Sequence, residues 1–303
     1  MSQQLADEQS NESLNAEQLL RSLLGVEVAL LLRSDPIARQ KRDPEGVHQL
    51  RVGSRRLRSE LRIMTRAMKP APLRYFLREL RWTGGVLGRQ RDADVLGEVL
   101  DDVNALLESS LPLSVLKRLN GIQAKGNRAV DALLDSTRYR QLVVRLSDAV
   151  VHPPLRAAAQ RPAMEMIGPS LTDTLSELFN AADEFGNAPS NLQLHQIRIL
   201  SKRGRYCAET ASALMGETAR RLARELESVQ TVLGELHDYA VAIDFLEEGI
   251  ETPHASQRTD DERIISVAIE HLVGLIEEMK LQWRAPLERG RILSDSLIAT
   301  ISR

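Results

Sequence analysis

The chain has 303 residues, of which 43% are hydrophobic and 3% aromatic, so it can bury a core, and its many Leu, Ala and Arg residues favour helices over sheets. A formal net charge of −2 and a pI near 6.4 exclude a generally basic protein, although Arg outnumbers Lys by 34 to 6. The single cysteine excludes a disulfide framework and a thiolate metal site, and the first residues lack the features of a signal peptide, so we expect a soluble cytoplasmic protein.

The first expected helix begins near Asn15, after a polar, acidic tail (residues 1–13) that we expect to be disordered. Asn15 suits an N-cap position, and a glutamine three residues later completes a capping box. This helix should end before Asp35-Pro36, because proline disfavours a helical conformation in the residue that precedes it. Pro44 then suits the first position of the next helix.

The helix expected over residues 44–69 has a cationic face opposite an apolar face. At 3.6 residues per turn, a stripe roughly 80° wide holds one histidine and five arginines: His48, Arg51, Arg55, Arg58, Arg62 and Arg66. Glu60 is the only acid from His48 to Lys69. Like charges at i,i+4 destabilise an isolated helix by about 0.2–0.5 kcal/mol per pair, so the stripe favours a multivalent anion as its partner. A simply solvated helix face is the alternative.

The remaining pattern predicts helices throughout and no strand of useful length. The expected helices cover residues 72–87, 92–108, 113–134 and 137–150, and then 170–184, 191–215, 217–233 and 237–250, followed by a long helix to about 283 and a short C-terminal one. Ser170 resembles the start of a capping box. A proline-rich segment, residues 152–169, is the expected linker between a first half (14–151) and a second half (170–303). Residues 251–258, with His254, should form a polar loop.

The basic helix occurs twice. The segment HQIRILSKRGRYCAE (195–209) matches the first copy at an offset of 147 residues, which pairs His48 with His195, Arg51 with Arg198, Ser54 with Ser201, Arg55 with Lys202, Arg56 with Arg203 and Arg58 with Arg205. A second match, LGRQRDADVL (87–96) with LGELHDYAVA (233–242), has an offset of 146. Two ordered matches at nearly one offset indicate a duplicated unit of about 145 residues.

The second copy carries less positive charge than the first. Glu227 stands where the first repeat has Arg81, and His237 replaces Arg91. We therefore expect the second half to bind an anion less firmly.

These motifs resemble the CHAD domain, the conserved histidine α-helical domain. The resemblance rests on HQLRVGSRRLRSELR and LRELRWTGGVLGRQRDADVL in the first half, and on LHQIRILSKRGRYCAE and LARELESVQTVLGELHDYAVA in the second. It covers about residues 15–300. It implies one all-α domain with two pseudo-symmetric helical halves around a basic channel or groove, and it implies binding of inorganic polyphosphate.

The composition supports a ligand made of phosphate alone. Proteins that bind single-stranded nucleic acid usually stack bases on aromatic side chains, and here only Tyr206 adjoins a basic stripe. We therefore expect inorganic polyphosphate as the partner, with sulfate or phosphate ions able to occupy the site, and we expect no membrane partner, no nucleic acid and no cofactor. Association with polyphosphate granules, regulation of polyphosphate metabolism and scaffolding would leave the same pattern in the sequence.

The expected site draws on both copies of the basic helix and on the helix after the first copy. Its residues are His48, Arg51, Arg55, Arg56, Arg58, Arg62, Arg78, Arg81, His195, Arg198, Lys202, Arg203, Arg205 and Tyr206. Arg56 and Arg203 project off the stripe, so they are expected to be secondary contacts or salt-bridge partners of carboxylates such as Asp92 and Asp238. The two histidines are expected to be neutral-to-cationic donors.

Two other functions remain open at this point. The dipeptide His237-Asp238, with His195 and Asp244, suggests a metal-dependent phosphohydrolase, but the first repeat has Arg91 where this dipeptide has histidine. The alternating strand of the tunnel triphosphatases that often accompany CHAD domains is absent. We therefore expect binding without turnover, with no catalytic residues and no metal. A helical adaptor that docks an acidic protein or a nucleic-acid backbone is the other alternative.

Overall fold

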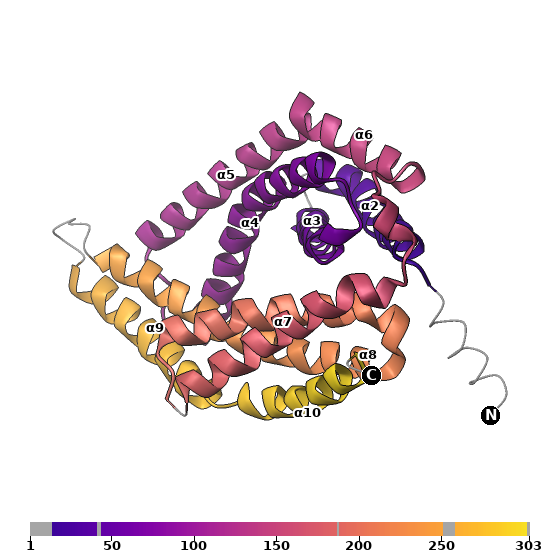
Figure 1. The fold of residues 1–303 in the computed structure, drawn as a ribbon. Helices are drawn as coiled ribbons and strands as arrows, with labels where there is room; N and C mark the ends of the chain where they lie inside the picture. Colours follow the sequence, from indigo (N-terminus) through magenta and orange to yellow (C-terminus); the bar gives the residue numbers. More distant parts are fainter. Residues whose placement is uncertain (1–13, 41–43, 187, 251–257, 302–303) are drawn as a thin grey trace.

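The computed structural model describes residues 14–40, 44–186, 188–250 and 258–301, and every regular element in these ranges is a helix (Figure 1). The prediction of an all-α fold is therefore confirmed. Within this part of the chain, no helix combines the length and the apolar character that crossing a bilayer requires. The expected tail, residues 1–13, and the expected loop around His254 lie outside the described residues.

Helix α2 (Ala16–Arg39) begins as predicted, with a reciprocal capping box. The backbone N–H of Gln18 donates to Oδ1 of Asn15 at 2.9 Å, and the backbone N–H of Asn15 donates to Oε1 of Gln18 at 3.0 Å. The predicted end before Asp35-Pro36 is wrong, because the helix continues through the proline to Arg39.

Tertiary packing explains why α2 tolerates its internal proline. Ser34 and Ala38, on either side of it, are buried. The neighbouring helix α3 (Pro44–Ile63) approaches so closely that a Cβ on Gly46 would lie 2.4 Å from the backbone nitrogen of Ala38. Burial of this turn outweighs a proline penalty of about 3 kcal/mol.

The first half continues with η1 (Met64–Arg66), α4 (Pro70–Leu106), α5 (Leu113–Asp135) and α6 (Thr137–Val151). The predicted break between residues 87 and 92 is wrong, since α4 is one continuous helix. Glycine costs a helix about 1 kcal/mol relative to alanine. This helix contains Gly84, Gly85 and Gly88, and buried leucines before, among and after them offset that cost: Leu80, Leu87, Leu96 and Leu100.

The segment between the halves is pinned to the first half, and the helix after it begins early. The short helix η2 (Ala157–Gln160) precedes α7 (Ala163–Phe185). Ser170 lies inside α7, so the predicted capping box there is wrong. The backbone N–H of Ala163 donates to the carbonyl of Leu14 at 2.9 Å, and the first turns of α7 are buried in the core, which starts this helix before Ser170.

The second half contains α8 (Asn191–Ile250), α9 (Arg258–Met279) and α10 (Arg284–Ile301). Helix α8 bends at Gly216, whose φ of 63° and ψ of −136° are not helical, and this confirms the predicted boundary between residues 215 and 217. The predicted break near residue 235 is wrong, because Leu233 and Leu236 are buried and the helix continues. Trp283 lies after the end of α9, and its indole N–H donates to the carbonyl of Lys280 at 2.9 Å.

Both halves contribute to a common main core that includes Leu57 and Leu61 of α3 and Leu175 and Leu178 of α7. A second core joins α4 and α5 to the end of α8 and to α9. In Figure 1, α3 is seen nearly end-on, with α2 to its right, α4 passing over it and down its left side, and α7 and α8 below. The shared core therefore holds α3 of the first half against α8 of the second.

Candidate functional site

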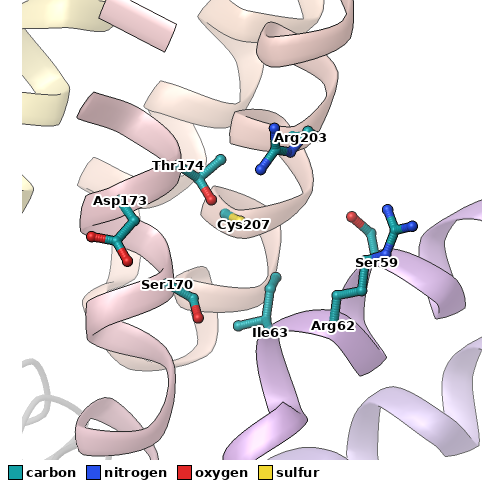
Figure 2. A pocket seen from close by; sticks show the side chains of 8 residues that line it. All are labelled: Ser59, Arg62, Ile63, Ser170, Asp173, Thr174, Arg203 and Cys207. Carbon is teal, nitrogen blue, oxygen red and sulfur yellow. The ribbon is translucent and has the colours of Figure 1, made fainter. Parts of the chain in front are cut away.

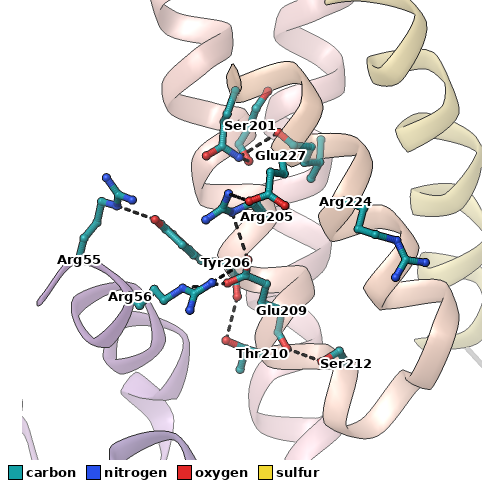
Figure 3. Close-up of polar contacts among 12 residues, drawn as sticks. Arg55, Arg56, Ser201, Arg205, Tyr206, Glu209, Thr210, Ser212, Arg224 and Glu227 are labelled. Carbon is teal, nitrogen blue, oxygen red and sulfur yellow. Dashed lines mark hydrogen bonds and ion pairs between the residues drawn. The ribbon is translucent and has the colours of Figure 1, made fainter. Parts of the chain in front are cut away.

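The two predicted basic stripes face each other where α3 meets α8. The apolar side of α3 is buried through Leu50 and Leu57, and the apolar side of α8 through Ile197. The polar sides meet at a hydrogen bond in which Nε of Arg55 donates to the hydroxyl of Tyr206 at 2.5 Å (Figure 3). Residues from both stripes are therefore brought to one interface.

Four cations form what we call the central cluster: Arg51 and Arg55 of α3, and Arg198 and Lys202 of α8. Burial and the charges of Arg55, Arg198 and Arg51 together lower the pKa of Lys202 to about 7. Burial also lowers the pKa of Arg51, as do the charges of Arg55 and Arg198. These cations lie close enough to repel one another, so an anion bound among them would be stabilising.

Arg51 lies across the neighbouring helix α4. A Cβ on Gly88 would be 3.7 Å from Nε of Arg51, which is van der Waals contact, and Nη2 of Arg51 lies 3.4 Å from Oδ1 of Asp92. Gly88 and Asp92 belong to the repeated segment LGRQRDADVL (87–96), which we call the first LG…D motif; its counterpart (233–242) is the second. Gly88 and Asp92 therefore position Arg51, an arginine of the central cluster.

Arg198 lies across the later part of α8 in a similar way. A Cβ on Gly234 would be 3.9 Å from Nε of Arg198. Burial raises the pKa of Asp238, the charge of Arg198 opposes that increase, and the charge of Asp92 adds to it. Asp238 therefore lies near both Arg198 and Asp92, so the two LG…D motifs meet beside the central cluster.

The two stripe histidines have different neighbours. Burial and the charge of Arg91 lower the pKa of His48, whose Nδ1 is buried without a hydrogen-bond partner among the described residues. The ring of His195 lies 5.2 Å from the ring of His237, centroid to centroid, and the pKa of His237 is lowered by burial, Arg198 and His195. An anion bound nearby would favour the protonated forms of His48 and His237.

Toward one end of the interface, the expected site residues are held in ion pairs. Nη1 of Arg205 lies 2.7 Å from Glu227 and its Nε lies 3.1 Å from Glu209, while Nε of Arg56 lies 3.4 Å from Glu209 (Figure 3). We call Arg56, Arg205, Glu209 and Glu227 the paired end. Arg56 thus pairs with a carboxylate, as predicted, but the acid is Glu209 and neither Asp92 nor Asp238.

Two buried carboxyl groups lie behind the paired end. Burial raises the pKa of Glu60 to about 8 and that of Glu27 to about 7, and the charge of Arg56 opposes both shifts. Burial in low dielectric disfavours a carboxylate, so at neutral pH Glu60 is mostly protonated and Glu27 is about half protonated. Because Arg56 is already paired with the carboxylate of Glu209, it is a weak candidate for direct contact with an anion.

At the opposite end, Arg58, Arg62, Arg81 and Arg203 form what we call the open end. Burial and the charges of Arg62 and Arg81 lower the pKa of Arg58. Burial and the charges of Arg203 and Arg81 likewise lower the pKa of Arg62. Arg203 makes an ion pair with Glu177 of α7 at 2.9 Å, a different acid from the predicted Asp92 or Asp238.

Arg78 lies apart from these clusters in its contacts. Its Nε is 2.7 Å from the buried carboxylate of Glu79, and its guanidinium lies 5.4 Å from the ring centre of Tyr75. Both of these contacts of Arg78 are with residues of its own helix, α4. A role for Arg78 in ligand binding therefore stays a prediction.

A cavity of about 450 Å³ opens between α3, α7 and α8 at the open end (Figure 2). The residues around it are Ser59, Arg62, Ile63, Ser170, Asp173, Thr174, Arg203 and Cys207. Burial raises the pKa of the Cys207 thiol to about 11, so this group stays protonated and contributes no charge. The cavity therefore combines two guanidinium groups and three hydroxyls with one exposed acid, Asp173.

Of the residues suggested for a metal site, His195 and His237 lie next to each other. Across the residues that the structure describes, however, no group of three or more His, Cys, Asp or Glu side chains is placed to hold a metal ion.

Residues 23–247 match the CHAD domain family, which is three quarters of the chain, and the protein therefore belongs to that family. The predicted family membership is confirmed.

Curated relatives come from Mycobacterium tuberculosis. The uncharacterized proteins MT2285 (strain CDC 1551 / Oshkosh) and Rv2226 (strain ATCC 25618 / H37Rv) are each 29% identical to this chain over 211 residues. The match covers 67% of this chain and 40% of either relative, so the chain spans less than half the length of these proteins.

Solved structures share the fold. The CHAD domain of the plant Ricinus communis has a TM-score of 0.67 and 24% identity, with 92% of each chain covered. PptA from Streptomyces chartreusis has a TM-score of 0.63 and 18% identity, with 94% of this chain and 99% of that chain covered. At these identities the likeness establishes the helical architecture alone.

Proposed function

We propose that the protein binds inorganic polyphosphate through the facing polar sides of α3 and α8, without turning it over. The observation that carries this proposal is the central cluster, in which cations of two helices lie close enough to lower the pKa values of Arg51 and Lys202. The CHAD family is associated with polyphosphate binding. Guanidinium groups hold phosphate oxygens through paired, charge-assisted hydrogen bonds, and a chain of phosphates would satisfy several of them in succession.

The surroundings of Tyr206 favour this ligand over a single-stranded nucleic acid. Tyr206 is 3% exposed, its hydroxyl accepts the hydrogen bond from Arg55, and its ring lies 5.6 Å from the Arg55 guanidinium. It therefore offers no free face on which a base could stack. Binding of this kind would also place the protein at polyphosphate granules.

Calorimetric titration with long-chain polyphosphate, and with single-stranded DNA of the same number of phosphates at the same ionic strength, tests the proposal. We expect polyphosphate to bind at least about tenfold more tightly, since the site makes no provision for bases. Equal affinities would indicate a generic polyanion surface, and binding of neither polymer would favour an acidic protein partner. Release of orthophosphate during the titration would contradict binding without turnover.

A further inference from the structure

The two ends of the site are related residue by residue, yet they differ in charge. The sequence matches at offsets of 147 and 146 pair Arg58 with Arg205, Arg62 with Glu209, Arg81 with Glu227 and Arg203 with Arg56. The open end thus contains four arginines, whereas the paired end contains two arginines and two glutamates.

The contacts follow this difference in charge. At the paired end, Arg205 makes ion pairs with both Glu209 and Glu227, and Glu209 makes a second ion pair with Arg56. The guanidinium groups there already have carboxylate partners, and Tyr206 occupies the adjacent space (Figure 3). An added anion would have to displace these ion pairs.

The open end has the opposite character. In the described part of the chain, no ion pair to a carboxylate engages Arg58, Arg62 or Arg81. Arg203 pairs with Glu177, but both side chains are about half exposed, and such pairs contribute little and exchange readily. Ser59 stands where the repeat has Tyr206, and the cavity of about 450 Å³ opens beside this smaller side chain (Figure 2).

We propose that a bound phosphate chain continues from the central cluster over the open end only, that one phosphate group enters the cavity between Arg62 and Arg203, and that the chain does not cross the paired end. This inference rests on the proposed binding of polyphosphate. The rise of α3 puts Arg62 roughly 10 Å along the helix from Arg55, a span that an extended phosphate chain can follow. The hydroxyls of Ser59, Ser170 and Thr174 line the cavity and can donate to phosphate oxygens.

Two substitutions that copy the other end test the proposal. Arg62→Glu introduces the residue found at Glu209, next to Arg203, and Ser59→Tyr introduces the side chain found at Tyr206. Each variant is titrated with long-chain polyphosphate and with tripolyphosphate, and circular dichroism checks that it is folded. We expect each to weaken the binding of long chains about tenfold or more, because the extension is closed, and to change tripolyphosphate binding at the central cluster less than about threefold.

A charge-matched control distinguishes this mechanism from a general effect of net charge. Arg140→Glu makes the same charge change at an exposed position on α6, and it should alter either affinity by less than about threefold. Unchanged binding of long chains by Arg62→Glu and Ser59→Tyr would overturn the inference, as would an equal loss for both ligands. If the unmodified protein failed to bind long-chain polyphosphate, the proposed function itself would be wrong.

Discussion

Replacing Arg51 and Arg198 together with glutamine will weaken the binding of long-chain polyphosphate by about two orders of magnitude. These two arginines come from the two copies of the basic helix and belong to the central cluster. A hydrogen bond to a charged group contributes roughly 1.5–3 kcal/mol, so the loss of two such contacts, roughly 3–6 kcal/mol, predicts a change of at least this size. Glutamine preserves much of the side-chain volume and can still donate to Asp92 or Asp238, so we expect the helices to remain folded.

The measurement is a pair of calorimetric titrations with circular dichroism of each variant. Arg33→Gln combined with Arg140→Gln is the matched control, because both positions are exposed and lie on α2 and α6, outside the facing sides of α3 and α8. If the Arg51/Arg198 variant bound polyphosphate as tightly as this control, the central cluster would have no part in recognition.

The affinity for polyphosphate will fall about tenfold between pH 7 and pH 9, and Lys202→Arg will abolish most of this decrease. In the free protein, burial and the charges of Arg55, Arg198 and Arg51 hold the pKa of Lys202 at about 7. A bound polyanion raises that pKa back toward its ordinary value, so binding takes up a proton above pH 7 and weakens as pH rises. Arginine remains charged throughout this range.

Calorimetry in buffers of different ionisation enthalpy checks the same mechanism directly. The unmodified protein should take up a fraction of a proton on binding at pH 8, and Lys202→Arg should take up much less. The neighbouring imidazoles His48 and His237 have lowered pKa values, so they are neutral over this range in the free protein. An equal decrease in affinity for both proteins would assign the pH dependence to the ligand or to other groups.

Helix content and the faces of the helices were predictable from the sequence, because periodicity at 3.6 residues reflects burial directly. Helix boundaries were less predictable where tertiary contacts oppose local preference. Pro36 lies within α2 because Ser34 and Ala38 are buried around it, and α4 crosses its glycines because leucines anchor it on both sides. Gly216 marks a true bend because its positive φ is a local backbone property.

The stripe residues were predictable for the same reason, but their partners were not. Nothing in the spacing of either basic helix indicates that Arg56 meets Glu209 or that Arg203 meets Glu177, since each contact joins two different helices. The asymmetry of the two ends did have a signal in the repeat alignment, where Arg81 matches Glu227 and Arg62 matches Glu209. Only the ion pairs in the structure show that these acids neutralise one end of the site.

A salt titration of the affinity for long-chain polyphosphate tests the central claim most directly. If each contacted phosphate contributes a slope of about 0.7, as for single-stranded nucleic acids, the four cations of the central cluster predict that log affinity falls with log salt with a slope of about 3 or more. The variant with Arg51 and Arg198 replaced by glutamine should lose roughly half of that slope. A slope below about 1 for the unmodified protein would contradict recognition by a cluster of cations.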